Sequence, residues 1–215
     1  MIRDQYFLPD YKALQCISRL EYCSKKCWFE KVLDALTAIK TRNATPRLSG
    51  SISDAALDEI LRAGLRAPDH ALLRPWKIIV VKGDKRNRLG TLFAEIAMTK
   101  DPDQTQEQTE RLKNKALRAP IILVVAAKIT EHPKVPEVEQ FLSAGAVVQN
   151  MCIAAHAMGY GAIWRTGDMA YDDLVASGLG LKGNEKIVGF IYIGEVEGRQ
   201  KKIPEINLED YVVHW

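Results

Sequence analysis

The chain has 215 residues, enough for one domain with a sizeable core, and its 30 Lys and Arg against 27 Asp and Glu leave a formal charge of +3. So small an excess excludes a strongly basic surface of the kind that binds nucleic acid or anionic membranes. A hydrophobic fraction of 47% and a charged fraction of 27% are typical of a folded globular protein, and four cysteines are too few for a secreted disulfide scaffold.

The first 31 residues differ from the rest of the chain. They contain Cys16, Cys23 and Cys27, with six and then three residues between them, and no histidine. A structural zinc site needs four ligands in tight pairs, so this spacing does not predict one. The segment has no continuous apolar stretch, and we expect no secretory signal peptide. We therefore expect an N-terminal extension over 1–31, of unassigned role, and one domain over 32–215.

Hydrophobic periodicity predicts the elements of this domain. An apolar series at helical spacing marks the core-facing side of a first helix: Val32, Leu33, Leu36 and Ile39. Ser53 is a good N-cap for a second helix, which must end before Pro68. The elements expected in chain order are helices over 29–39 and 53–67, a strand over 76–81, helices over 84–98 and 104–117, a buried strand over 121–127, a helix over 137–158, a strand over 160–164, a short helix over 168–177, a strand over 186–194 and an irregular tail over 201–215.

This order mixes helices and strands but breaks strict alternation of the two. It predicts a single domain of the α+β, or loosely α/β, class.

One segment tests whether the chain is a soluble protein. The 24 residues from Phe141 to Trp164 contain no Asp, Glu, Lys or Arg, and such a run could cross a bilayer. However, polar residues such as Gln149 and His156 interrupt it, and Gly159 breaks it near its end. All-round apolarity is also typical of a central helix buried in a globular protein. We adopt that interpretation, with Gly159 just after the end of the helix.

Three loops contain residue types suited to binding. Lys40 to Asn43 combines cations with a hydroxyl and an amide, which suits a phosphate, although composition alone favours simple capping of the preceding helix. The loop over 62–76 contains two prolines and is either a restricted binding loop or a solvated turn. The segment over 159–167 has two glycines before a strand, but its third glycine falls too late for a dinucleotide fingerprint.

The sequence offers little for hydrolytic or metal chemistry. It contains neither G-x-S-x-G nor H-E-x-x-H. The four histidines form no pair at helical i, i+4 spacing: His70, His132, His156 and His214. Cys152 lies inside the apolar run, where a cysteine is usually inert packing. We therefore expect no metal site.

Two long segments together resemble the nitroreductase family of FMN-dependent oxidoreductases, in its compact NAD(P)H nitroreductase subgroup. Residues 60–81 read ILRAGLRAPDHALLRPWKIIVV and are similar to that subgroup's R-A-P-D-H loop, followed by P-W and a strand. Residues 143–167 read SAGAVVQNMCIAAHAMGYGAIWRTG and are similar to its small-residue helix, followed by G-x-G-x-I-W-R-S-G. The resemblance covers 32–215. It implies a mixed sheet flanked by helices and an obligate homodimer whose two FMN sites are built from both chains.

The resemblance also implies binding residues. The family's Arg-Arg-Ser phosphate motif reads Thr41, Arg42 and Asn43 here, so the first arginine and the serine are replaced; Lys40 is placed to compensate. The implied FMN contacts are Thr41, Arg42, Asn43, Arg66, His70, Trp164, Arg165 and Thr166. The implied NAD(P) contacts are Ala154, Ala155, His156, Ala157, Met158 and Gly159. A basic residue of the tail, Lys201 or Lys202, is a further candidate for the phosphate.

The implied reaction is a hydride transfer in two halves, from NADH or NADPH to FMN and then to an electron-poor acceptor such as a nitroaromatic or a quinone. Such chemistry belongs to the cofactor, so no catalytic side chain is named. The alternatives are another flavin reaction on the same fold (enone reduction, dehydrogenation or dehalogenation) or a flavin-binding protein with little turnover. The expected partners are a second copy of the chain and a small-molecule acceptor, with no nucleic acid and no membrane, in the cytoplasm.

Overall fold

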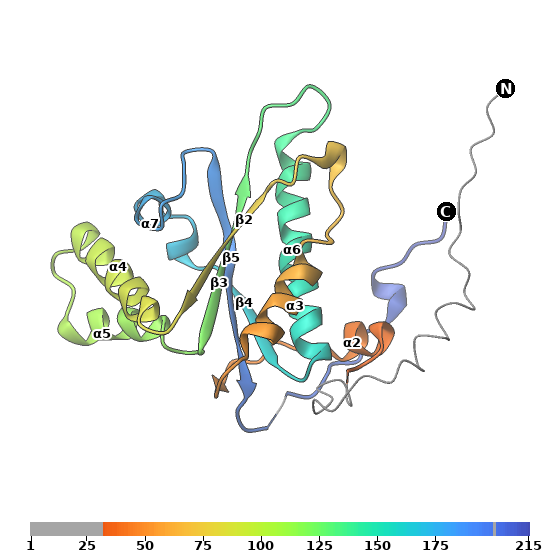
Figure 1. Cartoon of the computed structure of the whole chain (residues 1–215), viewed down its shortest axis with the longest axis horizontal. Helices are drawn as coiled ribbons and strands as arrows, with labels where there is room; N and C mark the ends of the chain where they lie inside the picture. Colours follow the sequence, from red (N-terminus) through yellow and green to blue (C-terminus); the bar gives the residue numbers. More distant parts are fainter. Residues whose placement is uncertain (1–31, 200) are drawn as a thin grey trace. The chain divides into compact units, whose positions relative to one another are not determined.

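The computed structural model describes residues 32–199 and 201–215 and confirms the α+β class (Figure 1). The helices are α2 (Ala35–Thr41), α3 (Asp54–Gly64), α4 (Lys85–Lys100), α5 (Gln106–Lys115), α6 (Glu137–Ala157) and α7 (Asp173–Gly178). The strands are β1 (Leu48–Ser49), β2 (Trp76–Lys82), β3 (Ile121–Lys128), β4 (Gly161–Arg165) and β5 (Glu185–Val196). Short 3-10 helices cover His70–Leu72, Asp168–Ala170 and Leu208–Asp210. The predicted extension over 1–31 lies outside the described residues.

The sheet has five strands with β5 at its centre. β5 pairs with β3 along one side and with β1 and β4 along the other, while β2 pairs with β3. All of these pairings are antiparallel, and one isolated parallel bridge joins Ala44 to Ala162.

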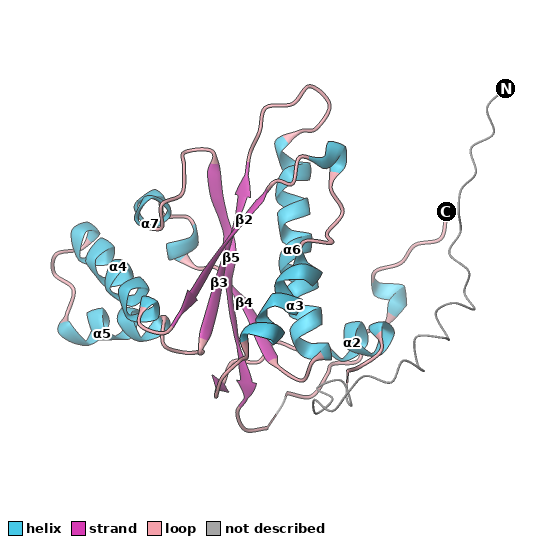
Figure 2. Ribbon diagram, in the orientation of Figure 1, coloured by secondary structure: helices cyan, strands magenta, loops and turns pink. Residues whose placement is uncertain are grey.

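Helices cover both faces of the sheet (Figure 2). α4, α5 and α7 lie on one face, and α3 and α6 lie on the other, with α2 against the end of α6. Successive side chains of β3 alternate between the two cores: Ile121 and Leu123 pack toward α6, whereas Ile122 and Val124 pack toward α4. Burial on both faces explains why the predicted strand over 121–127 is apolar throughout.

Local signals in the sequence place the ends of several helices. The Ser53 hydroxyl accepts a hydrogen bond from the Ala56 amide and caps α3, as predicted. Thr105 and Gln108 form a reciprocal capping box at the start of α5. Gly159 follows α6 with a φ of +84°, a backbone conformation that glycine adopts without strain.

The first helix differs from the prediction. α2 begins only at Ala35, because the Asp34 carboxylate caps it by accepting a hydrogen bond from the Thr37 amide. Its apolar series does not pack into the core of the chain, since Leu36 is 66% exposed and Ile39 is 53% exposed. Val32 and Leu33 precede α2, so the predicted helical period holds only for Leu36 and Ile39, and the apolar side that they mark is an uncovered surface.

The uncharged run divides into two elements rather than forming one span. α6 buries one side in the core, through Val147, Val148 and Met151, and the chain then turns at Gly159 into β4. In the part of the chain that the structure describes, no helix has both the length and the apolar character needed to cross a membrane.

Candidate functional site

The ends of α2 and α6 meet and bring several of the predicted residues together. The Thr41 hydroxyl lies 2.8 Å from Nε2 of His156, and the Asn43 side-chain amide donates to the Lys201 carbonyl at 3.1 Å. Arg42 follows α2 directly and is close enough to act electrostatically on His156. Residues from three distant parts of the sequence thus converge at this end of α6.

The hydrogen bonds fix how His156 is oriented. Thr41 donates its only hydroxyl proton to the Thr37 carbonyl at 2.6 Å, so its oxygen must accept the bond from Nε2 of His156. Partial burial, followed by the positive charge of Arg42, holds the pKa of His156 below its usual value. We therefore assign a neutral imidazole at pH 7 that carries its proton on Nε2, with Nδ1 free to accept.

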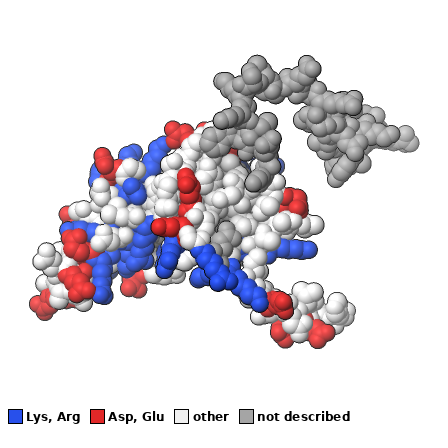
Figure 3. Space-filling model, turned by 90° about the horizontal axis from the view of Figure 1, so that it is seen from below, with Lys and Arg blue, Asp and Glu red and all other residues white. Residues whose placement is uncertain are grey.

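A cavity of about 350 Å³ opens beside this junction. It is lined by the segment after α2, the C-terminal end of α6 and the chain around the end of β5, and its cationic side chains are Arg47, Arg199 and Lys201. One carboxylate, that of Glu197, also lines it, so the cations are in excess. In Figure 3, which views the molecule from below, several Lys and Arg side chains gather near the centre of the face. Such a surface suits an anionic group.

Trp164 projects from β4 on the α6 side of the sheet. Its indole Nε1 donates to the Val188 carbonyl at 3.2 Å, and 43% of the residue is exposed. Gly189 makes room for the ring, because a Cβ there would lie 2.1 Å from Nε1. Gly145 of α6 borders the ring edge, and a Cβ there would lie 3.8 Å away, in ordinary van der Waals contact. The small residues predicted on α6 thus border a flat, partly open aromatic surface.

Arg165 lies on the other side of the sheet from Trp164, because successive strand residues point to opposite faces. Its guanidinium sits over the Tyr192 ring, 5.9 Å from the centroid, in the layer between the sheet and α4. Of the predicted W-R-T contact, only Trp164 therefore presents its side chain to the α6 side. Thr166 follows in an exposed turn.

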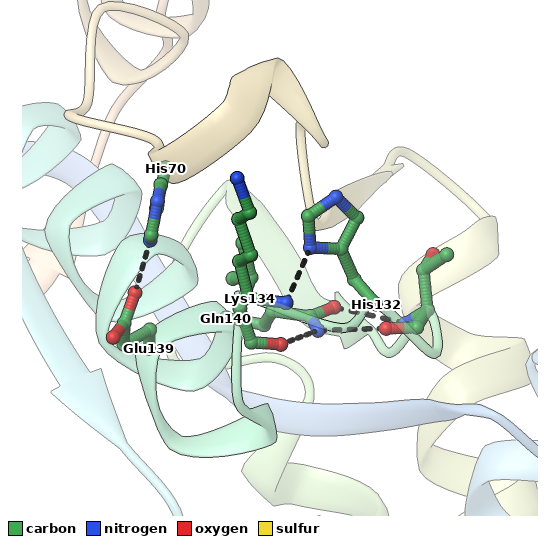
Figure 4. A network of polar contacts seen from close by, with 7 residues as sticks. His70, His132, Lys134, Glu139 and Gln140 are labelled. Carbon is green, nitrogen blue, oxygen red and sulfur yellow. Dashed lines mark hydrogen bonds and ion pairs between the residues drawn. The ribbon is translucent and has the colours of Figure 1, made fainter.

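The other predicted loop lies at the opposite end of α6 (Figure 4). His70 Nδ1 is 2.7 Å from a carboxylate oxygen of Glu139 in the first turn of α6. Its loop is strained, because Ala71, Leu72 and Arg74 adopt positive φ values of 60°, 55° and 48°. The Asp69 carboxylate stabilises this conformation by accepting from the Arg74 amide at 2.6 Å.

These two groups of residues are far apart within one chain. Glu139, which holds His70, and His156, which contacts Thr41, are separated by 17 residues of α6, which corresponds to roughly 26 Å along a helix. Arg66 is exposed just after the C-terminus of α3, on the same loop as His70. The eight predicted FMN residues therefore do not form one cluster in a single chain.

The buried cysteine and the acidic and histidine side chains of the described residues offer little for covalent or metal chemistry. Burial raises the pKa of the Cys152 thiol to about 11, so it stays protonated at neutral pH, as its predicted packing role requires. Among the described residues, no group of three or more His, Cys, Asp or Glu side chains could hold a metal ion.

The chain is similar to known proteins over most of its length. The family model described as "Nitroreductase family" matches residues 48–195. The Escherichia coli protein named "Putative NAD(P)H nitroreductase YdjA" is 37% identical over 179 residues, which cover 83% of this chain and 96% of that protein. The chain belongs to the nitroreductase family.

Solved structures show the same fold. The nitroreductase-like family protein from Bacillus cereus superposes with a TM-score of 0.71 at 23% identity, covering 85% of this chain and 96% of that one. A variant of the FMN- and NADPH-dependent nitroreductase NfnB from Sphigopyxis sp. superposes with a TM-score of 0.68 at 17% identity, covering 85% and 99%.

Some residues of this candidate site were not predicted from the sequence. Arg47 and Arg199 lie outside the recognised motifs, and only the fold brings them to the cavity beside His156. Glu139 was not predicted because it lies in the first turn of α6, where acidic residues ordinarily serve to stabilise the start of a helix. Of the predicted NAD(P) residues, Ala155 is fully buried in the core, so its side chain offers no surface to a ligand. The roles of the others stay predictions.

The electrostatic link between Arg42 and His156 can be measured directly. Replacing Arg42 with Ala removes a nearby positive charge, so the pKa of His156 is expected to rise toward its usual value. NMR titration of the His156 imidazole gives this shift, and Arg88→Ala, at an exposed position of α4, is the charge-matched control. An unchanged His156 titration in Arg42→Ala would show that burial alone lowers the pKa of His156.

Proposed function

We propose that the chain is an FMN-dependent oxidoreductase that takes a hydride from NADH or NADPH and passes it to an electron-poor acceptor such as a nitroaromatic or a quinone. The observation that carries the proposal is the cationic cavity at the α2–α6 junction on the same side of the sheet as the exposed Trp164 ring. A flavin mononucleotide combines the two features that these surfaces would contact, a phosphate and a flat ring system.

The residues at the junction fit a phosphate. Arg42 and Asn43 follow α2, and Arg47, Arg199 and Lys201 line the adjoining cavity. A guanidinium can bind a phosphate through two parallel hydrogen bonds, which compensates for the arginine replaced by Thr41. The Thr41 hydroxyl is already engaged by Thr37 and His156, so its role in this proposal is to orient His156 rather than to contact phosphate.

The surface beside Trp164 fits the flavin ring. The indole is fixed by its hydrogen bond to the Val188 carbonyl, and its ring edge lies against Gly145. The exposed aromatic ring therefore lies beside a residue without a side chain. FMN bound here would supply the two-electron chemistry, and the protein would bind it, orient it and exclude water. Cys152 is buried and protonated and takes no part.

A homodimer is part of the proposal, because it would bring Arg66 and His70 of one chain to the phosphate-binding end of another. Exposed apolar side chains mark the surface that a second copy would cover: Leu36 and Ile39 on α2, Val138 and Leu142 on α6, Leu72 in the strained loop, and Tyr211, Val213 and Trp215 in the tail. So many exposed apolar side chains are unusual for a monomer. A two-fold axis would supply both ends of α6 to each site.

The central test is a flavin assay on the purified chain. FMN should remain bound after desalting, and anaerobic NADH or NADPH should bleach its absorbance, with colour restored by a nitroaromatic or a quinone. Arg42→Ala should weaken FMN binding about 10- to 100-fold, because a charged hydrogen bond to the phosphate is lost. Arg62→Ala, which alters an exposed pair with Glu59 on α3, is the matched control.

Three outcomes would change the proposal. A chain that binds no FMN at all contradicts the flavin site. Retained FMN that neither nicotinamide reduces favours the alternative of a flavin-binding protein with little turnover, and reduction without reoxidation by nitroaromatics or quinones favours another flavin reaction. A cytoplasmic location belongs to the same proposal, since the electron donor is the cell's own NAD(P)H.

A further inference from the structure

A second cavity lies on the opposite face of the sheet, under α4 and α5. The pairing of β4 with β5 places Ile163 opposite Tyr192 and Arg165 opposite Phe190, so these four side chains share the face that packs against α4. The cavity measures about 290 Å³. The sheet therefore separates it from Trp164 and the proposed flavin site.

Three cations from three different elements line this cavity. Lys115 ends α5, Arg118 lies in the loop before β3, and Arg165 ends β4. Asp168 is the carboxylate in the lining, which leaves an excess of two positive charges. The floor is apolar and aromatic, made by Phe93, Met169, Phe190 and Tyr192. The lining therefore combines a cationic rim with an apolar, aromatic base.

The three cations lack the partners that their neighbours have. Nearby on α5, Arg111 pairs with Glu107 at 2.6 Å and Lys113 pairs with Glu110 at 2.8 Å. Within the described part of the chain, no carboxylate comes within 4.0 Å of the charged nitrogens of Lys115, Arg118 or Arg165. Gathering unpaired like charges raises the free energy of the folded state, and a bound anion would lower it.

Arg165 supplies a buried donor with no acceptor. Its Nε is shielded from solvent and makes no hydrogen bond, although a guanidinium carries five N–H donors. The guanidinium lies over the Tyr192 ring, 5.9 Å from its centroid, within the range of a cation–π contact. Burial raises the pKa of Tyr192, opposed by the charges of Arg165 and Arg118, so both arginines lie near a phenol that keeps its proton.

We propose that this cavity is a second binding site, for a small molecule that bears a phosphate or pyrophosphate group. Lys115, Arg118 and Arg165 bind that group above the aromatic base. Arginine forks and a lysine form the donor set that phosphate oxygens require. The volume lies at the lower limit of pockets that hold drug-sized ligands, so the ligand is smaller than a dinucleotide. The site uses side chains that face away from the proposed flavin site and does not depend on it.

The test is a calorimetric titration of inorganic pyrophosphate into the full chain with whatever flavin it carries. We expect saturable binding of one pyrophosphate per chain at this cavity, and of a second at the α2–α6 junction in any chain that carries no flavin. Arg118→Ala and Lys115→Ala should each weaken it at least about 10-fold, the loss of one charged hydrogen bond. Lys113→Ala, on the same helix but paired with Glu110, should leave the affinity unchanged. Circular dichroism and thermal melting confirm that each variant folds.

A parallel titration of Arg42→Ala separates the two anion sites. Retained pyrophosphate binding in Arg42→Ala, combined with its loss in Arg118→Ala, supports the second site. Absent binding in the parent chain overturns the proposal, as does binding lost in Arg42→Ala but kept in Arg118→Ala. If Lys113→Ala weakens pyrophosphate binding as much as Arg118→Ala does, the proposal is also overturned. The affinity would then depend on the overall positive charge of this surface and not on contacts in the cavity.

Discussion

Replacing Leu142 with Glu is expected to convert the protein into a monomer and to abolish retention of FMN. Leu142 lies on the outward side of α6 and is 68% exposed, next to the similarly exposed Val138. In the proposed dimer its side chain is covered by the second chain, so a carboxylate there would be buried without a partner. A two-fold axis puts two copies of the substitution in the same interface. We therefore expect the dissociation constant of the dimer to rise at least about 100-fold.

Size-exclusion chromatography with light scattering measures the dimer, and flavin absorbance after desalting measures FMN retention. The matched control is Leu174→Glu on α7, a half-exposed leucine on the opposite face of the sheet. It should leave both readouts unchanged. A Leu142→Glu protein that becomes monomeric yet keeps FMN would show that one chain builds the whole site, contrary to the proposed sharing of Arg66 and His70.

The sequence predicted most elements because their signals are local. The apolar run of β3 and the capping serine of α3 each depend on a few neighbouring residues, and both elements lie where the pattern indicated. The first helix shows where that reasoning fails. A helical period in Leu36 and Ile39 says that one side of the helix is apolar, but not whether this chain or another covers it.

The sequence predicted individual residues of the candidate site but not how they are arranged in space. The motifs named Arg42, His70 and Trp164, but only the fold shows that α6 separates the first two. Strand alternation alone would have placed Trp164 and Arg165 on opposite faces, and this signal was available in the sequence. The pairing of His156 with Thr41 spans 115 positions, and no periodicity of the sequence encodes such a contact.

Replacing Gln140 with Leu is expected to give the largest loss of stability among the substitutions considered. Gln140 is 1% exposed in the first turn of α6, and its amide binds the loop before the helix (Figure 4). Its oxygen accepts from the Thr130 amide at 2.9 Å, and its nitrogen donates to the Thr130 carbonyl at 2.8 Å and to the Val135 carbonyl at 3.3 Å. Leucine fills the volume but leaves these backbone groups unpaired, which costs about 3 kcal/mol.

Urea unfolding at a fixed protein concentration gives this difference in the free energy of unfolding. Gln106→Leu, at an exposed position in the first turn of α5, is the control and should change stability by less than about 0.5 kcal/mol. A Gln140→Leu protein as stable as the parent would mean that water replaces the amide at all three backbone groups. Glu139 adjoins Gln140 and contacts His70. If this end of α6 completes the partner's FMN site, loosening the loop before α6 should therefore also weaken FMN binding. Lost stability with unchanged FMN affinity would instead confine the role of Gln140 to folding.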